Sequence, residues 1–553
     1  MQWEIIKEPE ELLPIPQSIL KTVKSYPENT ALQILTPDGE IQKWTYNELA
    51  SLIISLAREI KAKNIEKGDR VAIYGHYNPE WVITYLAIQF AGAIGVPLDN
   101  RLTYREVNHF LNNSGAKILF ASEELLSQDI KISKPLKMPK ATSKIDDFTL
   151  PQLTLDDTAL ILYTSGTTGS PKGVVLTQRN LSSNVEMLRQ TIDFNTKDVF
   201  YSLLPLNHVF SQTINILAPF YIGASATLAR SLKSKEIKED CIKTQPTIFP
   251  VVPLILEKFI KGIEKEISKL PPVKKVLFGT LNGVGTFLHK VKKGSGSFLY
   301  STIRKQVGLD NLKLLVPGSA ALPKWVSEKF EKWGFPLIQG YGLTETSPVV
   351  AVNPPNAPKN QSVGLPLLGL DVKILNPGEK GIGEIAVKGD SVFKGFWKNE
   401  EATAEVFEGE WFKTGDMGYI DSDGYLYITG RKKSVIVTRG GKNIYPEEIE
   451  TFLSESPLIE EVLVLYQTSP TQKSKELVAI IYPNYEELDA YCEKQKIKDR
   501  DPHKILTEVV KKRNEDLTDF KRIRRVKIRD EEFPKTTTQK IKRYLFEEKG
   551  LEV

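Results

Sequence analysis

The chain has 553 residues, which is too long for one ordinary hydrophobic core and predicts two or more domains. With 41% hydrophobic and 26% charged residues it has the composition of a soluble globular protein, and its net charge of +5 is too near balance for a general nucleic-acid-binding protein. Cys241 and Cys492 lie far apart in the sequence, without a CxxC or Cys/His cluster, which argues against a zinc site or a disulfide framework and favours a cytoplasmic location.

The N-terminal region is predicted to alternate helices and strands. Its first residues, MQWEIIKEPEELLP, lack the apolar core of a secretory signal. Thr45 followed by Glu48 is a capping-box pattern in front of helical spacing that continues to residue 60. Residues 69–75, DRVAIYG, and 116–122, AKILFAS, have the pattern of short apolar strands, and this alternation predicts a parallel sheet.

One apolar run approaches the length of a membrane span. It covers residues 81–98, WVITYLAIQFAGAIGVPL, whereas a spanning helix needs about 20 such residues. Pro79 precedes the run, Gly92 and Gly95 interrupt it, and Pro97 stands near its end. The pattern therefore predicts a buried helix that continues into a strand, in preference to a membrane span.

The rest of the chain is predicted to be rich in strands up to residue 430 and mixed after it. Residues 121–158 are rich in Lys, Ser and Pro and are interpreted as a surface connection. Residues 364–430 hold short strands between Gly and Pro turns, which indicates antiparallel sheet, and a domain boundary is expected near residue 430. Further strands are predicted at 159–163, 199–204, 226–230, 247–252, 312–318 and 336–342.

A glycine-rich loop joins two of these apolar runs in YTSGTTGSPKGVVLT, residues 163–177. Glycine lets backbone N–H groups turn inward as an anion-binding nest, hydroxyl side chains add donors, and Lys172 adds a positive charge. The pattern differs from the common nucleotide P-loop, which needs four residues between its first glycine and a Gly-Lys-Ser/Thr sequence. From these residues alone, a phosphate-binding loop and a structural loop both remain open.

Two further motifs carry groups suited to a nucleotide. In QGYGLTETSP, residues 339–348, the glycines permit a tight turn, Tyr341 offers a flat face for a base, and Glu345 is a hard oxygen ligand suited to Mg²⁺. In FKTGD, residues 412–416, the carboxylate of Asp416 can accept hydrogen bonds from both ribose hydroxyls. Taken alone, the first motif also fits a capped helix start, and the second also fits an ordinary turn.

Together, these motifs and others in the C-terminal region resemble the adenylate-forming superfamily, which includes acyl-CoA synthetases, luciferases and peptide-synthetase adenylation domains. The motifs stand in the family's order from about residue 30 to 545. The resemblance implies an α/β multidomain fold, in which a large N-terminal domain combines doubly wound α/β subdomains with a small distorted β-barrel and precedes a small mobile α+β C-terminal domain. The implied boundaries are 1–430 for the N-terminal AMP-binding and acyl-binding domain, 431–433 for a hinge and 434–553 for the C-terminal domain.

By this resemblance, the nucleotide site combines the glycine-rich loop, the GYG motif and residues near the hinge. Glu345 is the implied magnesium ligand and, with Thr344 and Lys540, is expected to be catalytic. Lys540 stands in FPKTTTQKIKRYL and is the implied lysine that enters the active site for the first half-reaction. The implied nucleotide-binding residues are Thr164, Ser165, Gly166, Thr167, Thr168, Gly169, Lys172, Gly340, Tyr341, Gly342, Thr344, Asp416, Arg431 and Lys540.

The resemblance also assigns residues to the second half-reaction, in GRKKSVIVTRGGKNIYPEEIE. Lys433 matches the hinge position around which the C-terminal domain rotates in relatives. The chain departs from the family pattern at Ser434, where relatives often have an acid, and at Gln539, where many have glycine. The loop that lines the CoA channel in relatives corresponds here to Gly440, Gly441 and Lys442.

Two shorter motifs indicate the acyl-binding side of the site. LLPLNHVFSQ, residues 203–212, resembles the family motif around a histidine near the acyl pocket, which assigns His208 to substrate binding. PGSAALP, residues 317–323, resembles the glycine turn that borders the adenine and acyl sites, which assigns Gly318 to the same pocket. As an isolated residue, His208 also fits a hydrogen-bonded core histidine.

Residues 274–310 form a long connection that resembles long-chain fatty acyl-CoA synthetases more than short-chain or aryl relatives. Its lysines alternate with Leu, Phe and Val at partly helical spacing, and it overlaps a basic region at residues 258–305. A segment of this kind can lie on an anionic membrane surface, and it also fits a solvated pair of helices.

The leading prediction is therefore a long-chain fatty acid–CoA ligase, which uses ATP, CoA and Mg²⁺ and forms acyl-AMP with release of pyrophosphate. The alternatives are an acyl–carrier-protein ligase, an aryl or short-chain acid–CoA ligase, and a non-enzymatic sensor of nucleotide or acyl-AMP. A sensor would be expected to lose Lys540 or Glu345, and both are present. No nucleic-acid partner is expected. The oligomeric state is left open, and a homodimer is one option. The predicted location is cytoplasmic, with peripheral contact at the inner membrane surface as an option.

Overall fold

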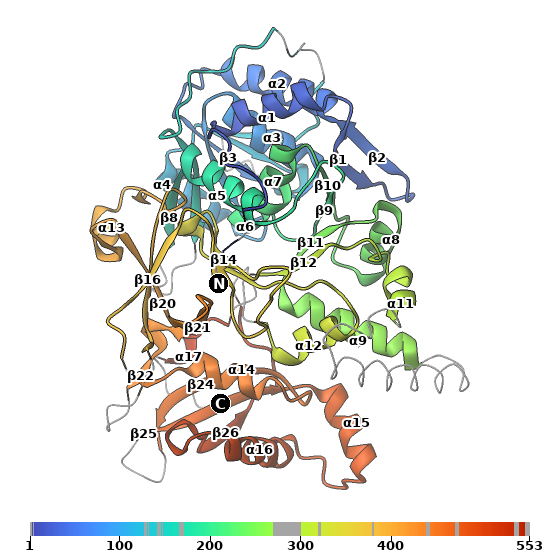
Figure 1. Cartoon of the computed structure of the whole chain (residues 1–553), viewed down its shortest axis with the longest axis vertical. Coiled ribbons are helices and arrows are strands. Elements are labelled where there is room, and N and C mark those ends of the chain that lie inside the picture. Colours follow the sequence, from blue (N-terminus) through green and yellow to red (C-terminus); the bar gives the residue numbers. More distant parts are fainter. Residues whose placement is uncertain are drawn as a thin grey trace.

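Two large sheets with helices packed between them make up the N-terminal part of the computed structural model (Figure 1). Helix α3 (Pro79–Phe90) contacts a strand of each sheet, and the largest hydrophobic cluster takes side chains from both. The structure describes residues 3, 5–126, 130, 132–140, 145, 147–164, 171–268, 300–318, 322–378, 381–437, 443–469, 475–535 and 541–547.

The first sheet has six strands in the order β12-β11-β9-β10-β1-β2. Neighbouring strands are parallel except for the β1–β2 hairpin. Its strands are β1 (Thr30–Leu35), β2 (Ile41–Thr45), β9 (Val199–Ser202), β10 (Ser225–Leu228), β11 (Ile248–Val251) and β12 (Leu314–Pro317).

The second sheet has seven strands in the order β18-β8-β7-β4-β3-β5-β6. Its pairs are parallel from β7 to β6 and antiparallel where β7, β8 and β18 meet. Its strands are β3 (Arg70–Tyr74), β4 (Ile94–Leu98), β5 (Ile118–Ala121), β6 (Ser133–Pro135), β7 (Thr158–Thr164), β8 (Lys172–Thr177) and β18 (Gly395–Phe396).

Two helices of this N-terminal part form where the sequence predicts them. Thr45 caps α2 (Tyr46–Lys61) with a complete capping box, and the apolar run at 81–98 folds as α3 followed by the buried strand β4, as predicted. No helix among the described residues is long and apolar enough to cross a membrane. The other α-helices described before residue 431 are α1 (Ile15–Ser25), α4 (Tyr104–Ser114), α5 (Gln178–Thr191), α6 (Val209–Ser211), α7 (Ala218–Ile222), α8 (Ser234–Thr244), α9 (Pro253–Ser268), α11 (Ser301–Gln306), α12 (Lys324–Lys332) and α13 (Glu400–Val406).

Most strands of residues 340–431 form two smaller sheets in which neighbouring strands are antiparallel, as predicted for most of this region. One follows the order β13-β14-β15, and the other follows β16-β17-β20-β19 with β21 paired to β20. Their strands are β13 (Gly340–Gly342), β14 (Val349–Val352), β15 (Leu365–Pro366), β16 (Asp371–Leu375), β17 (Gly383–Lys388), β19 (Phe407–Glu408), β20 (Trp411–Ile420) and β21 (Leu426–Arg431).

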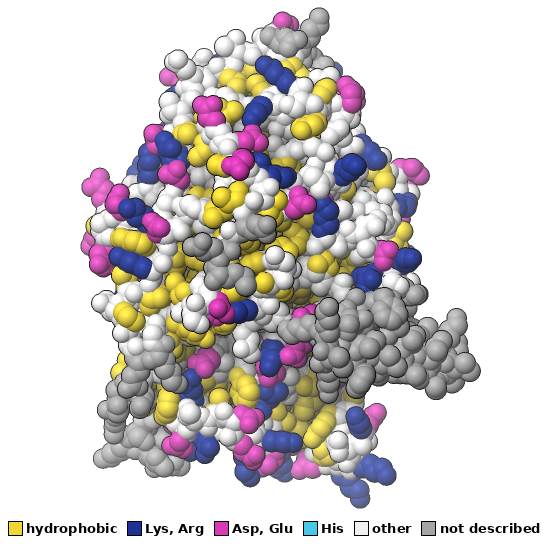
Figure 2. Space-filling view, in the orientation of Figure 1, with side chains coloured by type: hydrophobic (Ala, Val, Ile, Leu, Met, Phe, Trp, Pro, Cys, Tyr) yellow, Lys and Arg dark blue, Asp and Glu magenta, His cyan; other side chains and the backbone are white. Residues whose placement is uncertain are grey.

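The C-terminal part has its own three-stranded sheet, β24-β25-β26, with hydrophobic clusters on both faces. This mixed α and β character after residue 430 was predicted, whereas the boundaries 1–430, 431–433 and 434–553 stay predictions. Hydrophobic side chains gather across the middle of the face shown in Figure 2, between the upper sheets and this C-terminal sheet. The C-terminal part contains α14 (Pro446–Leu453), β24 (Ile459–Thr468), β25 (Lys475–Pro483), α15 (Tyr485–Gln495), α16 (Pro502–Arg513) and β26 (Arg525–Ile528). The pair β22 (Ile436–Val437) and β23 (Asn443–Ile444) precedes them.

Two predicted segments differ from the structure. The presumed surface connection at 121–158 contains β6, which pairs in parallel with β5 at the sheet edge. Pro135 lacks a backbone donor and is tolerated at such an edge, and a strand of three residues has too few positions to show periodicity. The strand predicted at 336–342 is regular only at Gly340–Gly342, because Leu337 instead makes an isolated parallel bridge to Leu315.

Candidate active site

The glycine-rich loop connects β7 and β8 as a hairpin, and Thr164 pairs with Lys172 at its base. Lys172 lies with its Nζ atom 5.1 Å from the ring centroid of Phe396 on β18, a cation–π contact that holds the ammonium beside the loop. The predicted phosphate-binding residues Ser165, Gly166, Thr167, Thr168 and Gly169 lie outside the described residues. The structure therefore locates the two ends of the predicted phosphate loop.

Strand β13 carries the GYG motif and explains why one of its glycines is required. A Cβ atom on Gly342 would lie 1.8 Å from the carbonyl oxygen of Pro348, so no larger residue fits. Gly340 is less crowded, since its Cβ would lie 3.2 Å from the carbonyl oxygen of Ala351. The backbone of this motif is thus held tightly against β14, which fixes the direction of the intervening Tyr341.

Thr344 and Glu345 lie in the short helix Thr344–Thr346 that follows β13. The hydroxyl of Thr346 donates to the carbonyl oxygen of Pro348 at 2.6 Å, and the Glu345 carbonyl accepts a hydrogen bond from the backbone N–H of Phe393 at 2.8 Å. The turn is therefore anchored on both sides, and Thr344 and Glu345 are partly exposed at its start.

The side chains of Tyr341 and Arg431 both contact the carboxylate of Asp416. The hydroxyl of Tyr341 donates to Oδ2 of Asp416 at 2.6 Å, and Nε of Arg431 lies 2.8 Å from Oδ1. Asp416 and Arg431 are also cross-strand partners in the β20–β21 register. The structure thus places a flat aromatic ring, a carboxylate and a guanidinium beside one another.

Opposite charges surround the guanidinium of Arg431. Burial alone would lower the pKa of Arg431, but negative charge on Asp416, Glu345 and Glu447 among its neighbours outweighs burial and raises the pKa. Glu345 therefore lies within electrostatic reach of the Asp416–Arg431 pair. The GYG turn and the end of β21 face a common region of the molecule.

Glu345, the predicted magnesium ligand, suits a site in which the protein supplies only some of the metal ligands. Within the described ranges, no group of three or more His, Cys, Asp or Glu side chains could hold a metal ion. Mg²⁺ usually binds through one or two carboxylates together with substrate phosphates and water. Glu345, a single partly exposed carboxylate close to the nucleotide residues, suits that kind of coordination.

The predicted acyl-side residues lie on elements that contact each other. His208 immediately precedes α6, and a Cβ on Gly318 would lie 2.9 Å from the ring of Phe210 in that helix. Burial alone would raise the pKa of Asp99, but hydrogen bonds from Arg101 outweigh it, and the pKa is lowered, with His208 among the neighbouring groups that contribute. The two motifs thus come together where Phe210, two residues after His208, lies against Gly318.

Residues assigned to the second half-reaction are described only in part. Lys433 is exposed in the single turn Lys432–Ser434 that links β21 to β22. The predicted CoA-channel residues Gly440, Gly441 and Lys442 and the predicted catalytic Lys540 lie outside the described residues. The chain on either side of Lys540 is anchored, since Lys535 pairs with Ile541 as a bridge and Arg543 contacts Glu450 at 2.6 Å.

Sequence reasoning missed two residues that the structure places at the site. Thr414 accepts a 3.1 Å hydrogen bond from the backbone N–H of Asp416 and donates one to the carbonyl oxygen of Ile385. Phe210 covers Gly318, as described above. Both residues stand inside motifs that were singled out, FKTGD and HVFSQ, but nothing in their spacing indicates what they contact.

Comparison with known proteins finds relatives that match most of the chain. The family model of AMP-binding enzymes matches residues 19–397. A long-chain-fatty-acid–CoA ligase of Mycobacterium bovis is 30% identical over 469 residues, which cover 78% of this chain and 77% of the relative. A 2-succinylbenzoate–CoA ligase of Geobacillus kaustophilus is also 30% identical, over 440 residues that cover 78% of this chain and 81% of the relative.

Solved structures agree at the level of the fold. The O-succinylbenzoate coenzyme A synthetase of Bacillus subtilis, solved in complex with ATP and magnesium ion, matches with a TM-score of 0.73 at 23% identity. The match covers 95% of this chain and 98% of that protein. The matched family model and the extent of the similarity to the Mycobacterium ligase together establish that this chain belongs to the family of AMP-binding enzymes.

Proposed function

We propose that this chain is an AMP-forming acid–CoA ligase whose acid is a long-chain fatty acid. The carboxylate would attack the α-phosphorus of ATP and release pyrophosphate, and the CoA thiol would then displace AMP from the acyl-AMP. This route solves two problems of carboxylate chemistry. A carboxylate repels nucleophiles through its charge and has a poor leaving group, whereas the mixed anhydride is neutral at the carbonyl and loses AMP readily.

The observation that best supports the proposal is the meeting of Tyr341, Asp416 and Arg431. In the proposed site, the ring of Tyr341 stacks on adenine and the two carboxylate oxygens of Asp416 accept the ribose hydroxyls. Arg431 supplies positive charge next to the sugar. The three side chains come from β13, β20 and β21, which are antiparallel strands and therefore rigid supports for such a site.

The remaining residues of the proposed site are expected to act through their charge. The first step concentrates negative charge around phosphorus, so catalysis depends mainly on positioning and on preorganised positive charge. In the proposed site, the loop at 164–172 and Lys540 hold the phosphates, and Glu345 holds Mg²⁺. When bound, the metal neutralises phosphate charge and orients the oxygens.

The acyl substrate is proposed from two kinds of support. The relative from Mycobacterium is named for long-chain fatty acids, and the long segment at 274–310 resembles that class in sequence. A second candidate, an aryl acid, has support of equal strength in the relative named for 2-succinylbenzoate. Phe210 beside Gly318 gives the proposed acyl pocket an aromatic wall, which suits either an alkyl chain or a ring.

The proposal is tested by measuring CoA-dependent AMP formation from ATP with short, medium and long-chain fatty acids and aromatic acids. We expect the highest kcat/KM with a long-chain acid. A maximum with an aromatic acid would replace the leading substrate with the second candidate. Pyrophosphate exchange without turnover of CoA would keep the adenylation step and indicate a carrier-protein acceptor, and neither activity with any acid would contradict the proposed function.

A further inference from the structure

The side chain of Tyr341 has two parts with different surroundings. The residue as a whole is partly exposed, as a ring that stacks on a base must be, but its hydroxyl is hydrogen-bonded to Asp416, whose side chain is only 6% exposed. Burial, with the neighbouring Asp416 carboxylate, raises the pKa of Tyr341 well above its ordinary value. The hydroxyl therefore keeps its proton throughout the physiological range and remains a hydrogen-bond donor.

The carboxylate of Asp416 is held by a hydrogen bond and an ion pair from two different elements. Tyr341 on β13 donates to Oδ2 at 2.6 Å, and Arg431 on β21 contacts Oδ1 at 2.8 Å. Each carboxylate oxygen can accept more than one hydrogen bond, so both oxygens retain capacity for a further donor. The backbone of Asp416 is also held, because its N–H donates to Thr414.

The hydroxyl of Tyr341 disfavours a different arrangement, in which Asp416 and Arg431 would form two parallel hydrogen bonds. A guanidinium forms a planar fork that matches a carboxylate with two parallel hydrogen bonds. In this structure Arg431 approaches Oδ1 through Nε, and its Nη1 atom instead lies 3.5 Å from the carbonyl oxygen of Thr414. Tyr341 donates to Oδ2, and the contact of Arg431 is with the other oxygen, Oδ1. Without that donor, Asp416 could rotate into a two-bond pair with Arg431.

We infer that Tyr341 is a positioning residue for ribose recognition, because its hydroxyl holds the Asp416 carboxylate in the orientation that presents both oxygens to the vicinal hydroxyls of the nucleotide. This role is distinct from stacking of the ring on adenine, and it rests on the proposed nucleotide site. It predicts that the hydroxyl contributes to ribose selection although it touches the sugar only through Asp416.

Tyr341→Phe separates the two roles, since it keeps the ring and removes only the hydroxyl. Tyr427→Phe is the matched control, because the Tyr427 hydroxyl also donates to a carboxylate, Asp421, at 3.2 Å, on β21 but outside the proposed site. AMP and 2′-deoxy-AMP would be titrated calorimetrically into the full-length wild type and both variants, and thermal unfolding would be measured in parallel.

We expect Tyr341→Phe to weaken AMP binding by about tenfold, as for loss of one hydrogen bond to a charged group, and to weaken 2′-deoxy-AMP binding much less. The preference for the ribonucleotide should therefore shrink, while Tyr427→Phe keeps it. In turnover, KM for ATP should rise with kcat changed less than twofold, and the unfolding temperature of Tyr341→Phe should match that of the control.

Three results would overturn the inference. Unchanged AMP affinity would show that the hydroxyl does not orient Asp416, and tighter binding would show that it competes with ribose. An equal loss for AMP and 2′-deoxy-AMP would assign the effect to packing of the ring. Failure of the wild type to bind AMP at all would be a different outcome, because it contradicts the proposed nucleotide site itself.

Discussion

At the scale of single residues, the first half-reaction is expected to depend most on Lys540. A lysine beside the α-phosphate would stabilise charge that develops only in the transition state, and loss of one such partner commonly costs on the order of 10²–10³ in rate. We expect Lys540→Ala to reduce acyl-AMP formation by about that factor and to change thioester formation from preformed acyl-AMP much less. Single-turnover assays of the two half-reactions measure this difference.

The neighbouring Lys542→Ala provides the control for general loss of positive charge near Lys540, since Lys542 lies just beyond the Lys535–Ile541 bridge. It should leave both half-reactions within a fewfold of the wild type. If Lys540→Ala slowed both half-reactions equally, the proposed role in adenylation would be wrong.

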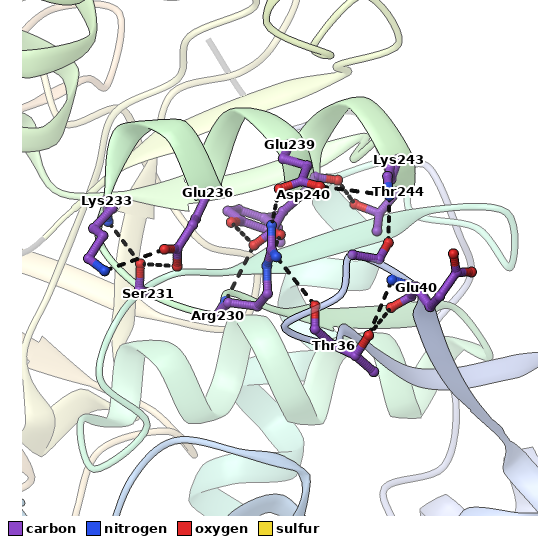
Figure 3. A network of polar contacts seen from close by, with 12 residues as sticks. Thr36, Glu40, Arg230, Ser231, Lys233, Glu236, Glu239, Asp240, Lys243 and Thr244 are labelled. Carbon is purple, nitrogen blue, oxygen red and sulfur yellow. Dashed lines mark hydrogen bonds and ion pairs between the residues drawn. The ribbon is translucent and has the colours of Figure 1, made fainter.

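At the scale of elements, a buried ionic network ties α8 to the first sheet (Figure 3). Arg230 follows β10 and contacts Asp240 on α8 at 2.8 Å, and it also donates to the carbonyl oxygen of Thr36 after β1. Asp240 is 0% exposed and accepts a further hydrogen bond from Tyr201 at 2.9 Å. Removing the arginine would leave a buried carboxylate without its cation.

We therefore expect Arg230→Ala to lower the free energy of unfolding by about 3–5 kcal/mol, as is typical when one partner of a buried ion pair is removed. Urea unfolding followed by tryptophan fluorescence checks the value. Lys233→Ala is the comparison, because Lys233 is 79% exposed and its contact with Glu236 is 3.5 Å, so its loss should cost less than about 1 kcal/mol. Equal effects of the two changes would contradict the importance of burial.

At the scale of the whole molecule, α9 connects the N-terminal part to the C-terminal sheet (Figure 1). Nζ of Lys261 lies 3.1 Å from Oε2 of Glu460 at the start of β24, and Asn484 donates to the same oxygen. Glu257 lies one turn before Lys261. Burial, and next the charge of Glu460, raise the pKa of Glu257 to about 7, while Lys261 opposes the rise.

A carboxyl whose pKa is raised in the folded state binds its proton more tightly there than in the unfolded chain. Its contribution is therefore most favourable at low pH and is lost as the pH rises from about 4.5 to about 7, where Glu257 ionises beside Glu460. We expect Glu257→Gln to raise the unfolding temperature relative to the wild type at pH 8 and to change it little at pH 5. Differential scanning fluorimetry across this range measures the effect.

Glu264→Gln, a change on the exposed side of α9, should not reproduce this pH dependence, because Glu264 pairs with Lys329 of the N-terminal part. If Glu257→Gln shifted the unfolding temperature equally at both pH values, ionisation of Glu257 at the contact would not be the cause. The predicted hinge at Lys433 concerns the same two parts of the molecule and stays a prediction.

Elements that depend on near neighbours in the chain could be predicted from the sequence. The capping box of Thr45 and Glu48 is satisfied within one turn, so α2 begins where its sequence indicates. The run at 81–98 is apolar on all sides with glycine at its break, so a helix followed by a strand could be read directly. Strand β6 could not be predicted, because it has three residues and pairs with β5, a neighbour that only the fold brings beside it.

In the candidate site, too, some features could be predicted from the sequence and others could not. Glycine and carboxylate motifs have recognisable spacing, so Tyr341, Asp416 and Arg431 could be named from the sequence through their resemblance to a family. Their mutual contacts depend on the packing of three strands, and the hydrogen bond from Tyr341 to Asp416 joins residues 75 positions apart. Local chemistry thus selects the residue types, whereas tertiary packing alone decides which atoms meet, since a contact between distant residues leaves no periodic signal in the chain.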